Sequence, residues 1–285
     1  MVRLFGICKV AAALALNFII ILNLSGQWTI TALVTGGVAL YVWLGGYLSL
    51  FKEGGVKCDK LPLYDKTRLQ AAKRQLVRDV HRESSVDLSG LRLYLIPGDD
   101  DMQATAYGAN CVSVARGTLD NTDPVTLNAV LAHEASHILH YDPEFSRAVF
   151  ASVALVVAAL GLMSVVFMIL IFVLFLVLSF FRSWLGVMAF QGTTKMVGGF
   201  FGLIQRSIVA LYQTLMCLAS RQNEYRCDLY ACSLGYGAQL AHFLAIAAPD
   251  MPRRLTFTEA LYRTHPATKL RIARLEQQLG LAKRQ

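Results

Sequence analysis

Long apolar runs alternate with mixed segments along this chain and divide it into four parts. The first part holds two apolar runs, Val10–Leu24 and Trp28–Phe51, separated by polar residues 25–27. An α-helix needs about 20 apolar residues to cross a membrane, so we expect a transmembrane hairpin over residues 1–51. A cleaved signal peptide is disfavoured, because no Ala-x-Ala-like cleavage site leads up to Trp28 and a second apolar run follows at once.

A second pair of apolar runs lies in residues 148–219. Ala148–Phe181 contains 34 residues without a charge, which is about 50 Å of helix against about 30 Å of hydrocarbon. This run fits either one long tilted span or two short ones. Met196–Ala219 is apolar apart from Gln205 and Arg206 near its middle. An arginine at such a depth costs about 2.5–3.5 kcal/mol, so either Arg206 faces other helices or water, or the span is shifted toward the preceding residues.

The remaining segments, 52–147 and 220–285, have the mixed character of a folded domain. Asp65–Glu83 has the pattern of an amphipathic helix, and Leu91–Ile96 and Asn110–Ala115 have that of short strands. A last helix is expected over Ala267–Leu279. The expected fold class is therefore mainly α: a multi-pass membrane protein with four transmembrane helices and an α+β domain with a small β-sheet, assembled from both segments.

Composition supports a membrane location for this chain. A hydrophobic content of 55% with 16% charged residues is too apolar for an ordinary soluble domain. The net charge is +8, but the basic residues form no stripe interleaved with aromatics, so nucleic-acid binding is not expected. Arg3 and Lys9 precede the first hairpin, and Lys52, Lys57 and Lys60 follow it. Because cytoplasmic loops are rich in Lys and Arg, we expect the mixed segments to face the cytoplasm.

A helix expected over residues 123–142 carries the candidate chemistry of the chain. Asp123 can cap it, Pro124 suits its first position, and apolar residues recur on one face. Residues 133–137 read H-E-A-S-H, an H-E-x-x-H sequence whose two histidines lie on the same helix face. They can hold one metal ion, with the glutamate beside them as a general base for water. The alternative is a solvated helix face that carries two histidines by chance.

A catalytic zinc ion takes three protein ligands, so the two histidines need a third partner. Glu224 and Asp228 lie four apart in a segment of helical character and would share one face. One carboxylate can bind the metal while the other orients a histidine. The alternative is a surface helix in which Glu224 pairs with Arg221 and Asp228 with Arg226.

Together, these motifs resemble those of the HtpX-like integral-membrane zinc metalloproteases, which are related to the CAAX prenyl proteases. The resemblance covers nearly the whole chain, with two apolar segments before and two after H-E-x-x-H. It implies a gluzincin-type domain with one zinc ion per chain, in which His133, His137 and Glu224 are the metal ligands. It also implies that Glu134 is the general acid–base and that Asp228 helps to orient the ligands without binding the metal itself.

Other positions extend the resemblance or depart from it. Asp142 matches an aspartate a few residues after the histidine pair. The T-H-P sequence that contains His265 matches a distal motif, which makes His265 the candidate donor to the oxyanion. Ala-Ser replaces the Leu-Gly of the usual HELGH motif, Gln103 stands where the family often has asparagine, and Cys227 replaces a common alanine. His140 would lie about 60° away from the direction of the pair and is not expected to be a ligand.

The expected function is that of a zinc endopeptidase of the cell membrane with its catalytic domain in the cytoplasm. By the resemblance, its substrates are misfolded or unassembled membrane proteins. Glu224 can share an ion with the histidines only if an even number of spans separates them, which favours one long span over Ala148–Phe181. Val112–Ala115 is the expected strand edge for a peptide substrate. Alternatives are a processing enzyme with one dedicated substrate, a non-proteolytic assembly factor that retains zinc, and a membrane-anchored nucleic-acid binder.

Overall fold

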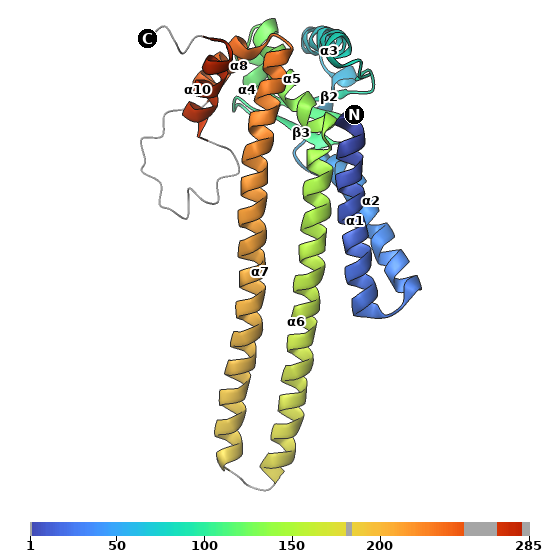
Figure 1. Cartoon of the computed structure of the whole chain (residues 1–285), viewed down its shortest axis with the longest axis vertical. Coiled ribbons are helices and arrows are strands. Elements are labelled where there is room, and N and C mark those ends of the chain that lie inside the picture. Colours follow the sequence, from blue (N-terminus) through green and yellow to red (C-terminus); the bar gives the residue numbers. More distant parts are fainter. Residues whose placement is uncertain (1, 181–183, 248–266, 281–285) are drawn as a thin grey trace.

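A small domain lies at one end of a bundle of long helices in the computed structural model, which describes residues 2–180, 184–247 and 267–280 (Figure 1). Four helices in this described part are long and apolar enough to cross a membrane, in agreement with the four apolar segments of the sequence. They are α1 (Val2–Ser25), α2 (Trp28–Lys52), α6 (Asp142–Phe180) and α7 (Trp184–Ser233).

The two pairs of spanning helices differ in length. α1 and α2 form a short hairpin that packs on α6 next to the domain, where the Asn17 side chain donates a hydrogen bond to the Ala148 carbonyl oxygen (3.2 Å). α6 and α7 lie side by side and extend well beyond this hairpin (Figure 1). α6 is one unbroken helix of 39 residues, about 58 Å long. This region therefore forms one long helix, as predicted, and not two short ones.

α7 continues without a break from the membrane segment into the domain. It has 50 residues and includes residues 184–195, which precede the apolar run at Met196, as well as the segment that carries Glu224. The expected domain boundaries at 147/148 and 219/220 thus fall inside continuous helices. Near the middle of α7, Gln205 donates a hydrogen bond to the Val157 carbonyl oxygen of α6. The neighbouring Arg206 is exposed and folds back along α7 onto the carbonyl oxygen of Gly202.

The domain combines short helices with a four-stranded mixed sheet, which confirms the mostly helical class with a small sheet. Its helices are α3 (Leu63–Ser84), α4 (Arg116–Asn121), α5 (Pro124–Leu139), α8 (Gly237–Ala247) and α10 (Thr268–Gln278), with a short 3-10 helix at Cys58–Lys60. Its strands are β1 (Val56–Lys57), β2 (Arg92–Ile96), β3 (Ala104–Gly108) and β4 (Cys111–Ala115).

The sheet has the strand order β1-β2-β4-β3, with β2 and β4 parallel and the other pairs antiparallel. β2 and β4 are the two strands expected from the sequence. β3, with the sequence A-T-A-Y-G, was not expected, because alanine and glycine are poor strand formers. The prediction that Val112–Ala115 forms the sheet edge is wrong, since β4 is paired on both sides. The edge on that side of the sheet is β3.

α5 runs through the centre of the domain between α3, α8 and the sheet. Asp123 caps its first turn, accepting hydrogen bonds from the backbone N–H groups of Val125 (2.8 Å) and Thr126 (3.1 Å). Leu131 and other apolar residues of α5 pack in the main core against α3 and the sheet. Most of its residues are buried, including His133 and Glu134. The alternative of a solvated helix face is therefore excluded.

Candidate active site

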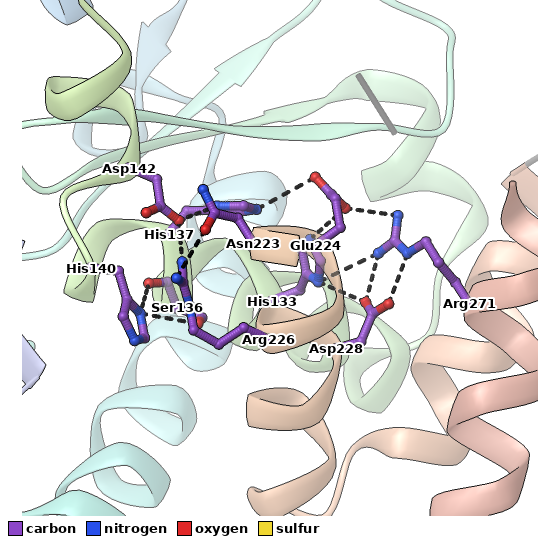
Figure 2. A network of polar contacts seen from close by, with 10 residues as sticks. All are labelled: His133, Ser136, His137, His140, Asp142, Asn223, Glu224, Arg226, Asp228 and Arg271. Carbon is purple, nitrogen blue, oxygen red and sulfur yellow. Dashed lines mark hydrogen bonds and ion pairs between the residues drawn. The ribbon is translucent and has the colours of Figure 1, made fainter. Parts of the chain in front are cut away.

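Three side chains that could bind a metal ion meet where α7 passes α5 (Figure 2). His133 Nε2 lies 3.3 Å from Glu224 Oε2, and His137 Nε2 lies 3.7 Å from Glu224 Oε1. One ligand atom from each of the three residues lies within 4.8 Å of the others. In a tetrahedral zinc site with bonds of about 2.1 Å, the ligand atoms are about 3.4 Å apart. The donor set and its spacing therefore fit a zinc ion.

The other ring nitrogen of each histidine is held by a carboxylate. His133 Nδ1 lies 3.0 Å from Asp228 Oδ1, and His137 Nδ1 lies 2.9 Å from Asp142 Oδ2. A histidine that donates its Nδ1–H to a carboxylate presents Nε2 as a lone pair in a fixed direction. Both imidazoles are thus oriented with Nε2 toward Glu224. The sequence expectation placed Asp228 in this supporting role, and the structure brings it to His133.

Arg271 from α10 is a site residue that the sequence did not reveal. Its side chain is buried and makes a two-pronged contact with Asp228 (2.8 and 2.6 Å) as well as an ion pair with Glu224 (2.9 Å). The surface-helix alternative required Asp228 to pair with Arg226. In the structure Asp228 pairs with Arg271 instead. The available signal was weak: Arg271 lies four residues before Leu275, and these are the buried residues of α10.

Asp142, the first residue of α6, is the centre of a second ionic cluster. Besides His137, it contacts Arg226 of α7 through Oδ2 (2.5 Å) and Lys9 of α1 through Oδ1 (2.6 Å). Arg226 is further fixed by Asn223 (2.9 Å; Figure 2). The support of His137 is therefore built from three spanning helices. Neither Lys9 nor Arg226 carries a sequence signal for this, because each meets Asp142 across a long stretch of sequence.

Burial and charge set the proton affinities of the central groups. Burial lowers the pKa of His133, but hydrogen bonds with Asp228 and Glu224 outweigh it and raise the pKa to about 10. A proton would therefore compete with any metal ion for this imidazole. Burial raises the pKa of Glu134, while the neighbouring histidines and a hydrogen bond from the Ala106 backbone N–H oppose part of the rise. Glu134 thus lies against β3 with a higher proton affinity than an exposed glutamate.

The sequence also matches a known family. The model of peptidase family M48 covers residues 67–279. The chain belongs to this family. A protease HtpX homolog from Acidiphilium cryptum (strain JF-5) is 30% identical over 235 residues, an alignment that covers 72% of this chain and 74% of that protein. The chain is thus an HtpX-like membrane metalloprotease of family M48, as the resemblance implied.

In this M48 peptidase, the described residues form a pocket of about 560 Å³ beside the three ligands. Thr105 and Ala106 of β3 line it, as does Glu134 of α5. Phe243 of α8 and Met216 of α7 contribute apolar surface. The pocket therefore offers an exposed strand edge, apolar walls and the candidate base in one place.

Other expected residues fall near the M48 site, or outside the description. His140 is not part of the ligand cluster; its Nδ1 lies 2.7 Å from the Ser136 carbonyl oxygen. Gln103 lines the pocket, and its amide donates a hydrogen bond to Asp99. Cys227 is buried close to His137 and Asp142, a second group of spacing suitable for a metal. His265 lies outside the described residues, so its role as oxyanion donor stays a prediction.

Proposed function

We propose that this protein is a zinc-dependent endopeptidase that cleaves polypeptide chains at the pocket beside β3. The observation that carries the proposal is the convergence of His133, His137 and Glu224, with each histidine already oriented by its own carboxylate. A zinc ion bound there would lower the pKa of water toward neutrality and polarise the scissile carbonyl group. These three residues would hold it.

Glu134 is the proposed general base and acid. Its carboxylate would take a proton from the attacking water and deliver a proton to the leaving amine. Burial raises its pKa, which helps it to keep the proton between the two steps. Arg271 is proposed to balance the charge of Glu224 and Asp228, so that two carboxylates can be buried next to each other. Asp228 and Asp142 would keep the imidazoles in position.

β3 is the proposed binding edge for the substrate. It is the outer strand of the sheet, it lines the pocket, and its residue Ala106 directs a backbone N–H toward Glu134. A peptide that adds to this edge as a further strand would present its backbone to the base. The substrate would thus be recognised mainly through its main chain, which suits unfolded or unassembled membrane proteins. We further propose that the domain faces the cytoplasm, because Arg3, Lys9 and Lys52 flank the first hairpin at that end.

The test compares wild-type protein with its Glu134→Gln variant, both purified in detergent and loaded with zinc. The assay measures cleavage of an unfolded test protein, and the zinc content of each sample is determined. We expect Glu134→Gln to keep zinc and lose cleavage by about 10²–10⁴-fold. Glu83→Gln, an exposed position on α3, is the matched control and should cleave normally.

Two outcomes would contradict the proposal. Equal cleavage by wild type and Glu134→Gln would mean that Glu134 is not the base. Absence of cleavage by all zinc-loaded samples, across several unfolded substrates, would favour an assembly factor that retains zinc without proteolysis.

A further inference from the structure

The first spanning helix reaches into the support of the active site. Lys9 Nζ lies 2.6 Å from Asp142 Oδ1 and 5.2 Å from the centre of the Phe145 ring. The other oxygen of Asp142, Oδ2, is used by His137 (2.9 Å) and Arg226 (2.5 Å). Lys9 therefore supplies the positive charge next to Oδ1, the Asp142 oxygen that does not contact His137. Asp142 is 6% exposed, so water can contribute little to its solvation.

α1 is also docked on the turn that places Asp142 beside His137. Between α5 and α6, Tyr141 adopts a positive φ of 54°, a conformation that a bulky side chain rarely takes. Gly6 packs directly on this turn: a Cβ on it would lie 2.7 Å from Tyr141 Cδ2 and 2.8 Å from the His140 carbonyl oxygen. Gly6 and Lys9 are three apart and so share one face of α1. Two independent contacts on that face thus meet the same turn.

Removal of the lysine charge has a defined consequence. A buried carboxylate that loses one of its cations is destabilised, and it can relax by rotating its unpaired oxygen toward remaining donors. Rotation of the Asp142 carboxylate would take Oδ2 out of line with His137 Nδ1. The imidazole would then lose its fixed direction, which is the property that such outer partners give to a metal ligand.

We infer that Lys9 is a positioning residue of the active site, acting on His137 through Asp142. The N-terminal span is accordingly a part of the metal centre and not only a membrane anchor. The inference rests on the proposed role of His137 as a metal ligand. It predicts a charge requirement at the partly buried position 9, inside a helix whose buried positions are Gly6, Val10, Ala13, Asn17 and Ile21.

The experiment measures zinc affinity of the full-length protein in detergent by competition with a chromophoric chelator. We expect Lys9→Gln to weaken zinc binding by about tenfold, the lower end of the range for outer-sphere partners. Lys9→Met, which keeps an unbranched side chain without the charge and suits a membrane helix, should show the same loss, and Lys9→Arg should restore most of the affinity. Arg3→Gln is the matched control, because it removes a charge from the same end of α1, and Arg3 donates to the Asp87 carbonyl oxygen and not to Asp142.

A double-mutant cycle separates positioning from general damage. If Lys9 acts through Asp142, Lys9→Gln should have no further effect on zinc affinity in an Asp142→Asn background. Three results would each overturn the inference. The first is wild-type zinc affinity in Lys9→Gln and Lys9→Met, and the second is an equal loss of affinity in Lys9→Gln and Arg3→Gln. The third is a double variant whose loss of affinity is the product of the two single losses. Unchanged zinc affinity in His137→Ala would instead contradict the proposed metal site, and the inference about Lys9 would fail with it.

Discussion

Replacement of Arg271 by methionine tests the charge balance of the site. Arg271 makes three charged contacts of 2.6–2.9 Å with Asp228 and Glu224, and it is 7% exposed. Loss of one partner from a buried ion pair costs about 3–5 kcal/mol, because the remaining charge stays buried without compensation. The buried residues of α10 are Arg271 and Leu275, so in Arg271→Met the buried native side chain that remains is Leu275. We therefore expect most of the cost to appear as easier local opening of α10.

Hydrogen exchange measured by mass spectrometry reports this opening directly. A loss of about 3 kcal/mol corresponds to roughly a hundredfold faster exchange of the protected α10 amides in Arg271→Met. The measurement uses protein treated with a chelator, so that a bound cation does not replace the missing charge.

Arg274→Met is the matched control on the same helix. Arg274 is exposed and stacks on the Tyr225 ring with a separation of 3.7 Å, a contact worth about 0.5–1 kcal/mol at an exposed site. Its exchange should rise by no more than about fivefold. Equal acceleration in the two variants, or unchanged exchange in Arg271→Met, would refute the argument that Arg271 balances two buried carboxylates.

Two further predictions concern proton release and the position of β3. Because the pKa of His133 is raised to about 10, zinc binding near pH 7 should release protons. Zinc affinity should therefore rise with pH, and calorimetric heats should differ between buffers of different ionisation enthalpy; identical heats would contradict this. A Cβ at Gly46 would lie 2.1 Å from the Tyr107 carbonyl oxygen of β3, whereas nothing lies within 4 Å at Gly37. Gly46→Ala should lower stability by about 1–3 kcal/mol and reduce cleavage; thermal unfolding and the peptidase assay should show Gly37→Ala unaffected.

Local patterns in the sequence were sufficient for the spanning helices and for the helix faces that carry the candidate ligands. Apolar runs of membrane length identify the spanning helices, because each helix must satisfy its backbone hydrogen bonds within itself. The spacing of four in H-E-x-x-H, and of four between Glu224 and Asp228, places each pair on one helix face whatever the rest of the chain does. The cap at Asp123 is equally local, and the structure shows it as expected.

The sheet shows where local pattern is not enough. β3 lies between β2 and β4 in the sequence but outside them in space, so the edge of the sheet depends on pairing between separate segments. An alternating pattern of apolar and polar residues indicates a half-buried strand, but it does not indicate with which strands that strand pairs. The pattern of Val112–Ala115 therefore predicts a strand but not its place in the sheet.

The partners of the ligands were decided by tertiary structure alone. Lys9 meets Asp142 across 133 positions of sequence, and Arg271 meets Asp228 across 43. A basic residue in the sequence is most often solvated. Only the packing of α1 on α6 and of α10 on α7 brings these two residues to buried carboxylates. The sequence by itself therefore determined which residues can bind a metal ion. The tertiary structure determined which charges hold those residues in place, because that depends on contacts between helices far apart in the chain.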